Sequence, residues 1–125
     1  MHEVDMTRCL ILSLEEWRRG RGEPCPRVHR VHLQVGAFTC VEPEALRFTY
    51  EAAISGGWLS QSRLEIQPVP LVGRCLACGE RYEPSPEGAY RSPCCDHPLE
   101  EILSGRELKI SHIDYDLPDP AISHP

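Results

Sequence analysis

Four of the seven cysteines lie within 21 consecutive positions, 75 to 95. The first two, Cys75 and Cys78, are separated by two residues, and Gly79 follows them. Two thiolates at this spacing can bind one metal ion from a tight turn, and glycine tolerates the positive φ angle that directs backbone N–H groups at sulfur. The spacing therefore predicts the first half of a structural zinc site.

The second half of such a site is expected after a hairpin of about 12 to 20 residues. The segment 92–97 reads Ser-Pro-Cys-Cys-Asp-His, so Ser92 stands where the first cysteine of a second Cys-X-X-Cys turn is expected. Asp96 follows Cys95 and can adopt the left-handed conformation that glycine would otherwise supply. The segment is thus predicted to form a second metal-binding turn that lacks its usual first ligand.

Three thiolates are predicted zinc ligands: Cys75, Cys78 and Cys95. The fourth ligand is either Cys94 or His97, and we favour Cys94 because four-thiolate sites commonly accompany such turns. A redox role for the first pair is disfavoured, because the residues after Gly79 offer no long helix of the kind that follows a thioredoxin-type motif. Structural zinc is also favoured over buried thiols without a metal.

His2 could support a different metal chemistry. A terminal amine, deprotonated backbone amides and an imidazole at position 2 can close adjacent chelate rings around one ion in a plane. Square-planar nitrogen donors suit Ni(II) or Cu(II) rather than zinc. A histidine at this position is weak support by itself.

Charge and size restrict the function classes. The chain has 125 residues, with 13 basic against 19 acidic side chains, which gives a net charge of −6. This length suits one domain with a small attached module. A surface made for phosphate backbones requires a basic face, so the acidic balance disfavours nucleic acid as a partner.

Neither a membrane span nor a signal peptide is predicted. The longest apolar runs fall well short of the roughly 18 to 20 residues that cross a bilayer. The first apolar run, 9–14, is too short for a signal peptide and has acidic residues on both sides. We therefore expect a cytoplasmic protein, in which an odd cysteine count indicates metal-binding or reactive thiols rather than disulfides. Cys9, Cys25 and Cys40 are isolated and are expected to be small buried or incidental residues.

Hydrophobic periodicity predicts the elements that carry these residues. Apolar spacings of three and four predict a helix over 4–18, whose buried stripe includes Trp17. Alternation over 27–35 predicts a strand, with His29 on its apolar side and His32 on its polar side, so both are read as packing or surface residues rather than ligands.

The second helix is predicted to begin at Pro43 and to end at Gly56-Gly57. Its apolar face should comprise four residues: Leu46, Tyr50, Ala53 and Ile54. A strand follows over 63–67, and Pro68 should end it, because proline does not fit a central strand.

Composition changes at residue 73. From there to residue 103 the chain has four cysteines, four prolines and few aliphatic residues, so it needs a metal or a host to fold. A last strand is predicted over 107–115, followed by a loose tail. The expected order is helix, strand, helix, strand, cysteine module, strand.

Four separated motifs together resemble the HypA/HybF family of nickel metallochaperones for hydrogenase maturation. They are Met1-His2-Glu3, the segment 42–48 (Glu-Pro-Glu-Ala-Leu-Arg-Phe), the cysteine module and the segment 104–110 (Ser-Gly-Arg-Glu-Leu-Lys-Ile). The resemblance covers residue 1 to about residue 116. It is specific because the four motifs occur in the family's order.

The resemblance implies an α+β fold with two modules. A nickel-binding domain of two helices on a small mixed sheet would comprise residues 1–70 and 104–118. A zinc-ribbon-like cysteine module over 71–103 would be inserted before the final strand, with a flexible tail over 119–125.

The resemblance also implies the site residues. His2 would be the essential nickel ligand, with Met1 and Glu3 beside it. Zinc would be held by Cys75 and Cys78 and by Cys95, which aligns with the family's last zinc cysteine when counted back from residue 105. Ser92 departs from the family's pattern, so the choice between Cys94 and His97 stays open.

The resulting functional prediction is a non-enzymatic carrier that transports Ni(II), contains structural Zn(II) and delivers nickel to the large subunit of a [NiFe] hydrogenase. A hydrogenase maturation GTPase is the implied loading partner; no nucleic acid or membrane partner is expected, and the chain would be a monomer or a weak homodimer. The alternatives are a zinc-ribbon interaction module without nickel delivery and an enzyme using Cys94-Cys95 as a vicinal redox pair. Neither the recipient, hydrogenase alone or urease as well, nor the full nickel geometry follows from the sequence.

Overall fold

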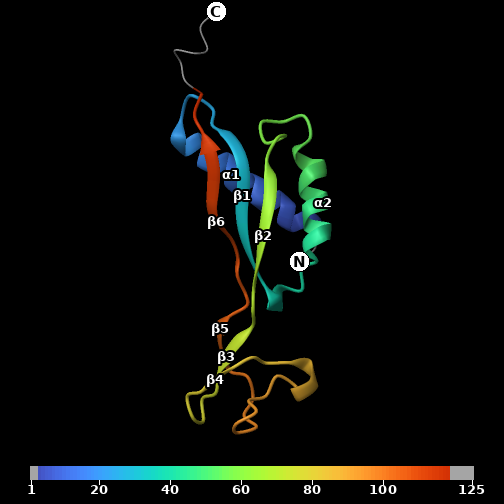
Figure 1. The fold of residues 1–125 in the computed structure, drawn as a ribbon, viewed down its shortest axis with the longest axis vertical. Helices are drawn as coiled ribbons and strands as arrows, with labels where there is room; N and C mark the ends of the chain where they lie inside the picture. The colour runs from blue at the N-terminus through green and yellow to red at the C-terminus, as the bar shows by residue number, and fades with distance from the viewer. Residues whose placement is uncertain (1–2, 119–125) are drawn as a thin grey trace, which may run out of the picture. The chain divides into compact units, whose positions relative to one another are not determined.

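The structure is a computed structural model that describes residues 3–118 (Figure 1). The main elements of the first part are α1 (Glu3–Arg21), β1 (Arg27–Gly36), α2 (Pro43–Ile54), β2 (Arg63–Val69) and β6 (Leu108–Asp116). The cysteine module carries β3 (Val72–Arg74), β4 (Arg81–Tyr82) and β5 (Glu101–Ser104). Short 3-10 turns lie at Ala37–Thr39 and Pro86–Gly88. The predicted order of elements is confirmed.

The chain divides into two compact units. The first comprises Met1–Leu33, Val41–Ile66 and Ile110–Pro125, of which residues 1–2 and 119–125 lie outside the described range. The second comprises Gln34–Cys40 and Gln67–Lys109. The predicted tail over 119–125 therefore falls outside the described residues. No helix within residues 3–118 has the length and apolar character needed to cross a membrane.

Helix α1 is longer than predicted. Met6, Leu10 and Leu14 recur every four residues and are buried, as expected for an amphipathic helix. The helix continues through Gly20 and ends at Arg21. The next residue, Gly22, has a φ of +75°, and its N–H donates to the carbonyls of residues 18 and 19. A left-handed glycine of this kind closes the last turn.

Helix α2 begins at Pro43, as predicted. The Glu42 side chain accepts a hydrogen bond from the Glu44 N–H at 3.1 Å and so caps the exposed first turn. Its buried row comprises Leu46, Tyr50 and Ile54. The prediction was wrong for Ala53, which is exposed because the buried face is a narrow row of residues four apart.

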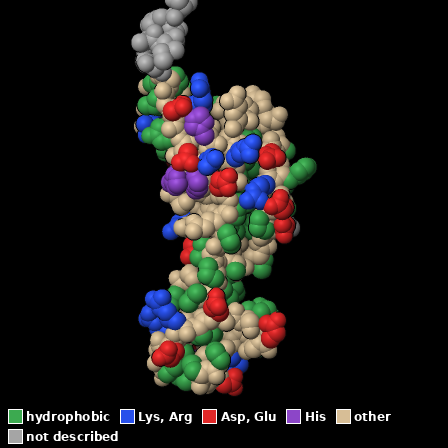
Figure 2. All heavy atoms as spheres, viewed as in Figure 1, with side chains coloured by type: hydrophobic (Ala, Val, Ile, Leu, Met, Phe, Trp, Pro, Cys, Tyr) green, Lys and Arg blue, Asp and Glu red, His purple; other side chains and the backbone are tan. Residues whose placement is uncertain are grey.

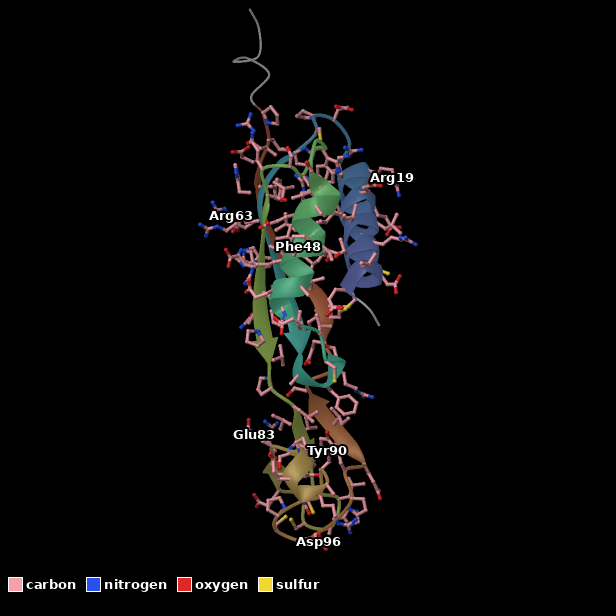
Figure 3. The ribbon with its side chains drawn as sticks, turned by 90° about the vertical axis from the view of Figure 1, so that its right-hand side faces the viewer. Arg19, Phe48, Arg63, Glu83, Tyr90 and Asp96 are labelled. Atoms are coloured by element: carbon pink, nitrogen blue, oxygen red, sulfur yellow. The ribbon has the colours of Figure 1, made fainter. Side chains whose placement is uncertain are left out.

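The three-stranded sheet has the order β2-β1-β6. Strands β1 and β2 run in the same direction and are joined through α2, whereas β6 runs in the opposite direction (Figure 1). Both helices lie on one side of this sheet (Figure 3). The small mixed sheet with two helices is the predicted α+β fold.

The alternation in β1 shifts by one residue near its start. Val31, Leu33 and Val35 are buried as predicted, but the buried residue before them is Val28 rather than His29. Two successive residues, His29 and Arg30, are both exposed, so the apolar phase predicted for His29 was wrong. The strand's opposite face therefore carries histidine side chains.

Strand β2 extends beyond its predicted end. It includes Pro68 and ends at Val69. Because β2 is at the edge of the sheet, the missing N–H of a proline there need not remove a bond of the sheet.

Within the second unit, the backbone of residues 105–107 lies close to the backbone of residues 36–38. The Gly36 N–H donates to the Glu107 carbonyl at 2.7 Å, and the Phe38 N–H donates to the Gly105 carbonyl at 2.8 Å. A Cβ atom added to Gly36 would lie 2.1 Å from the Gly105 carbonyl carbon. This contact leaves no room for a side chain at Gly36, and a Cβ atom at Gly105, whose φ is +113°, would lie 2.6 Å from the Leu71 Cα atom.

The second sheet supports the cysteine turns. Its strand order is β4-β3-β5, and both pairings are antiparallel. Gly73 in the central strand faces Tyr82 on one side and Ile102 on the other. Cys75 follows β3 directly and is fully buried, while Tyr82 in β4 is 8% exposed.

Candidate metal centre

The first cysteine turn is closed by two backbone hydrogen bonds. The Gly79 N–H donates to the Cys75 carbonyl at 2.6 Å, and the Cys75 N–H donates to the Glu80 carbonyl at 2.8 Å. Gly79 has a φ of +82°, which confirms the left-handed conformation expected at this position. The turn exposes Cys78 while Cys75 stays buried.

The second turn has the same backbone pattern. The Asp96 N–H donates to the Ser92 carbonyl at 2.8 Å, and the Ser92 N–H donates to the His97 carbonyl at 2.9 Å. Asp96 has a φ of +50°, as predicted for a residue that replaces glycine. Ser92 therefore occupies the backbone position that corresponds to Cys75 in the first turn.

The buried Ser92 side chain stabilises the second turn by a hydrogen bond. It is 2% exposed, and its Oγ accepts a hydrogen bond from the His97 N–H at 3.0 Å. A hydrogen bond with the Ser92 hydroxyl is also the largest cause that lowers the pKa of the Cys75 thiol, to about 6. The Ser92 hydroxyl thus stabilises the thiolate form of Cys75. Ser92 itself does not belong to the group of clustered sulfur ligands.

The structure brings four sulfur atoms together. The Sγ atoms of the group lie within 4.8 Å of one another: Cys75, Cys78, Cys94 and Cys95. Tetrahedral zinc with Zn–S bonds of about 2.3 Å requires sulfurs about 3.8 Å apart, and the Sγ atoms of Cys78 and Cys94 are 3.3 Å apart. His97 is not in this group, and its Nε2 lies 3.7 Å from a Glu100 carboxylate oxygen.

The electrostatics of the group favour a bound cation. Hydrogen bonds with the sulfurs of Cys78, Cys94 and Cys75 raise the pKa of Cys95 to about 12. The Glu80 N–H alone would lower the pKa of Cys78, but the Cys94 sulfur and burial outweigh it and the net shift is upward. Four neighbouring thiols resist joint ionisation unless a positive ion compensates their charge. The donor set fits a divalent metal.

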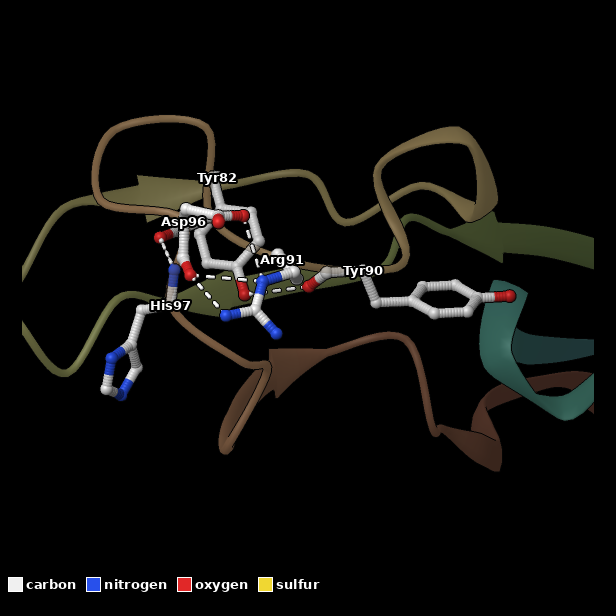
Figure 4. A network of polar contacts seen from close by, with 6 residues as sticks. Tyr82, Tyr90, Arg91, Asp96 and His97 are labelled. Carbon is white, nitrogen blue, oxygen red and sulfur yellow. Dashed lines mark hydrogen bonds and ion pairs between the residues drawn. The ribbon is translucent and has the colours of Figure 1, made fainter.

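A polar network holds the second turn in place (Figure 4). Arg91 Nε donates to the Asp96 carboxylate at 2.9 Å and to the Asp96 carbonyl at 3.0 Å. The Tyr82 hydroxyl donates to the Tyr90 carbonyl at 3.1 Å. Strand β4 and the residue preceding Ser92 therefore both fix the loop that presents Cys94 and Cys95.

The residues of the predicted nickel site are only partly described. Met1 and His2 lie outside the described residues. Glu3 begins α1, and its Oε1 accepts from the Glu42 N–H at 3.4 Å. The start of α1 is thus next to the residue that caps α2.

The three isolated cysteines are exposed: Cys9, Cys25 and Cys40. Burial, one of the two expectations for them, was wrong.

Sequence reasoning missed a second group of metal-ligating side chains. His32, His112 and Asp114 have ligand atoms within 4.8 Å of one another. Two of these residues are 80 positions apart, and only the pairing of β1 with β6 brings them together. The signal that could have found them is the polar phase of both strands combined with a predicted strand register.

Known proteins match the chain over most of its length. The family profile described as "Hydrogenase/urease nickel incorporation, metallochaperone, hypA" matches residues 1–115. The hydrogenase maturation factor HypA of Synechococcus sp. is 49% identical over 117 residues, which cover 93% of this chain and 87% of that protein. The guanidine hydrolase-activating protein A of Synechocystis sp. is 41% identical over 121 residues, which cover 97% of this chain and all of that protein.

A solved structure shows the same fold. The solution structure of the Ni metallochaperone HypA from Helicobacter pylori matches with a TM-score of 0.68 at 17% identity. The match covers 94% of this chain and all of that one. Together with the match over residues 1–115, this confirms the resemblance inferred from the four motifs: the chain belongs to the HypA family of metallochaperones for nickel incorporation.

Proposed function

We propose that this protein binds Ni(II) through His2, with Met1 and Glu3 beside it, and delivers the ion to the large subunit of a [NiFe] hydrogenase. The observation that carries this proposal is the family match over residues 1–115, which includes the Met1-His2-Glu3 opening. A carrier must release its cargo. A site with a single imidazole suits reversible binding, whereas a buried cage would hold the ion too long.

The contacts of Glu3 support a role for the start of α1. Its carboxylate faces the Glu42 N–H at 3.4 Å, and its carbonyl lies 3.5 Å from the Thr49 hydroxyl. Thr49 Oγ1 is also 2.6 Å from Thr7 Oγ1. These contacts attach the first turn of α1, which follows His2 in the sequence, to α2.

We further propose that a structural Zn(II) is held by four thiolates: Cys75, Cys78, Cys94 and Cys95. The clustered sulfurs and the matching turns support this set. A zinc ion would compensate the thiolate charges and join the two turns, which belong to a segment, 73–103, with few aliphatic residues. His97 is the less favoured fourth ligand, because its side chain lies beside Glu100.

Nickel binding would belong to residues 1–70 and 104–118 and zinc binding to residues 71–103. A maturation GTPase would load the nickel, and the chain would act in the cytoplasm as a monomer or weak homodimer. It would catalyse no reaction itself and would contact neither nucleic acid nor membrane.

A second recipient is supported by one relative. The Synechocystis protein that is 41% identical to this chain is named as an activator of guanidine hydrolase. Guanidine hydrolase is therefore the alternative client. Co-expression of this chain with each client separately would distinguish them: activation of hydrogenase alone supports the first proposal, and activation of guanidine hydrolase alone overturns that choice of recipient.

Elemental analysis of untagged protein tests the metal sites. We expect one zinc per chain in the wild type and in His2→Ala, and one nickel equivalent fewer in His2→Ala than in the wild type. His29→Ala is a matched control, because it removes an exposed imidazole from elsewhere. Zinc retention together with nickel uptake indifferent to His2 would overturn the N-terminal site and favour the zinc-ribbon interaction module.

A further inference from the structure

Three side chains form a compact donor group on the sheet, remote in sequence from the cysteine turns. His32 Nε2 lies 2.8 Å from Asp114 Oδ2, and His112 Nε2 lies 2.8 Å from Asp114 Oδ1. One carboxylate therefore contacts two imidazoles, each through a different oxygen. All three residues belong to the first unit.

The two rings are already arranged side by side. The centroids of the His32 and His112 rings are 3.9 Å apart, with an interplanar angle of 16°. The Ser111 hydroxyl donates to the His32 carbonyl at 3.2 Å, which adds a further link between β1 and β6. Two strands that pair in this way hold the donors with little freedom of the backbone.

The group is open to solvent. The side chains of His32, Asp114 and His112 are 27%, 41% and 60% exposed. In the space-filling view, histidine side chains gather over β1 and β6 (Figure 2). The helices lie on the other side of the sheet, so an ion could reach the group from water (Figure 3).

The donor chemistry indicates the class of ion. Imidazole suits Zn(II), Cu(II) and Ni(II), whereas all-oxygen sites suit Mg(II) and Ca(II). Two imidazoles and one carboxylate on a single face leave the other coordination positions for water or for a further ligand. We propose that His32, His112 and Asp114 form a second, exposed metal site, which binds one divalent first-row transition ion of the Ni(II)–Zn(II) class.

Binding would exchange hydrogen bonds for metal bonds. The Nε2 lone pairs and one Asp114 oxygen would bind the ion in place of the contacts between imidazole and carboxylate. Each neutral imidazole would carry its proton on Nδ1, and an imidazolium would release one proton to solvent on binding. The three ligand atoms need only small side-chain rotations, because they already lie within 4.8 Å of one another.

The sheet contains its own control. His29 Nε2 lies 2.9 Å from Asp116 Oδ2, which is a second contact of the same type between β1 and β6. This pair is comparably exposed, at 49% and 56%, but within residues 3–118 it is not part of a group of three ligands. The His29–Asp116 pair therefore shows how much metal an exposed histidine beside an aspartate binds when no third donor is near.

The test uses the full zinc-loaded chain with His2→Ala, so that the proposed N-terminal nickel ligand is absent. Ni(II) is titrated while the imidazole resonances are followed by NMR and the affinity by calorimetry. We expect one equivalent to broaden the His32 and His112 signals before that of His29. Asp114→Asn should weaken the binding about tenfold or more, since even loss of a supporting group commonly costs this much.

Asp116→Asn is the matched control and should leave the affinity unchanged. His112→Gln gives a second variant at the most exposed ligand. The fluorescence of Trp17 and Trp58, which both belong to the first unit, reports whether this unit stays folded. Equal broadening of His29, or equal effects of Asp114→Asn and Asp116→Asn, would overturn the proposal and indicate nonspecific binding to surface imidazoles. Because His2 is absent throughout, this result is independent of the outcome at the N-terminus.

Discussion

Ser92 and Cys75 occupy equivalent positions in two turns that share the same pair of backbone hydrogen bonds. In each turn the carbonyl of the first residue accepts from the N–H four residues later, and its N–H donates to the carbonyl five residues later. The two turns therefore differ in side chains rather than in backbone. Cys94, the residue before the last cysteine of the second turn, corresponds to Ala77 in the first and brings its sulfur to 3.3 Å from Cys78.

The identity of the fourth zinc ligand can be tested by two substitutions. Cys94→Ser should lower the zinc affinity and the thermal stability of the cysteine module, because it removes one of four clustered sulfurs. His97→Asn should leave both unchanged, since the His97 side chain lies beside Glu100 instead. Elemental analysis after challenge with a chelator measures the difference. Zinc loss confined to His97→Asn would assign the ligand to His97.

The equivalence of the two turns predicts that a cysteine at position 92 restores the zinc binding that is lost when Cys94 is removed. Ser92→Cys combined with Cys94→Ala should restore a four-thiolate site, because position 92 has the backbone environment of Cys75. Zinc retention against a chelator should therefore recover from the level of Cys94→Ala toward that of the wild type. Ser92→Ala is the control, because it removes the acceptor of the His97 N–H without adding a thiolate and should cost about 1–3 kcal/mol of folding free energy. A double variant no better than Cys94→Ala would contradict the equivalence.

Asp114 predicts a specific acid dependence of stability in the first unit. Hydrogen bonds from His32 and then His112 hold the pKa of this carboxyl below its usual value of 3.8. A carboxyl whose pKa is lower in the folded state contributes stability that is fully present above the unfolded-state pKa and is lost as pH falls through the folded-state value. Wild type and Asp114→Asn should therefore differ in urea midpoint near pH 6 and converge below pH 3.8.

Tryptophan fluorescence is a suitable probe for this titration, because Trp17 and Trp58 both belong to the first unit and the Trp17 ring is 4.9 Å from that of Tyr115 on the same strand as Asp114. Asp116→Asn removes the same charge two residues away and serves as the control. A difference between wild type and Asp114→Asn that persists unchanged to pH 2 would show that the carboxylate does not contribute through its ionisation.

In the buried Tyr50–Ser62 pair, removal of the two hydroxyl groups should lower the free energy of unfolding by different amounts. The Tyr50 hydroxyl and Ser62 Oγ are 2.7 Å apart, and Ser62 Oγ also donates to the Leu59 carbonyl at 2.7 Å. Tyr50→Phe should cost about 0.5–1.5 kcal/mol, because Ser62 keeps another partner. Ser62→Ala should cost about 1–3 kcal/mol, because it leaves a buried hydroxyl unpaired. Urea denaturation measures both, and equal costs would contradict this assignment of partners.

Local chemistry in the sequence determined the elements of this protein. The four-residue spacing of Met6, Leu10 and Leu14 predicted α1, and Pro43 predicted the start of α2. Such patterns are readable because hydrophobic periodicity and helix capping act within a few residues. The turns at Gly79 and Asp96 were predicted for the same reason, since a positive φ depends on the residue itself and its neighbours.

The spacing of the cysteines also predicted a metal centre, but it left the fourth donor open. Cys94 directly precedes Cys95 and His97 lies two positions after it, and both side chains can bind zinc. The direction of each side chain depends on how the 92–97 loop is held by Arg91 and Ser92. That arrangement is a property of the folded module.

Only the tertiary structure decided which distant residues meet. His32 and Asp114 are 82 positions apart, and their contact follows from the register of β1 with β6. Neither residue carries a motif, so no local pattern marked them. Strand register is specified where one face of a sheet is buried, and the shift of one residue before Val31 places Val28 instead of His29 on the buried face. Short-range periodicity therefore determined the elements and the cysteine turns of this protein, whereas long-range packing decided which side chains form its candidate sites.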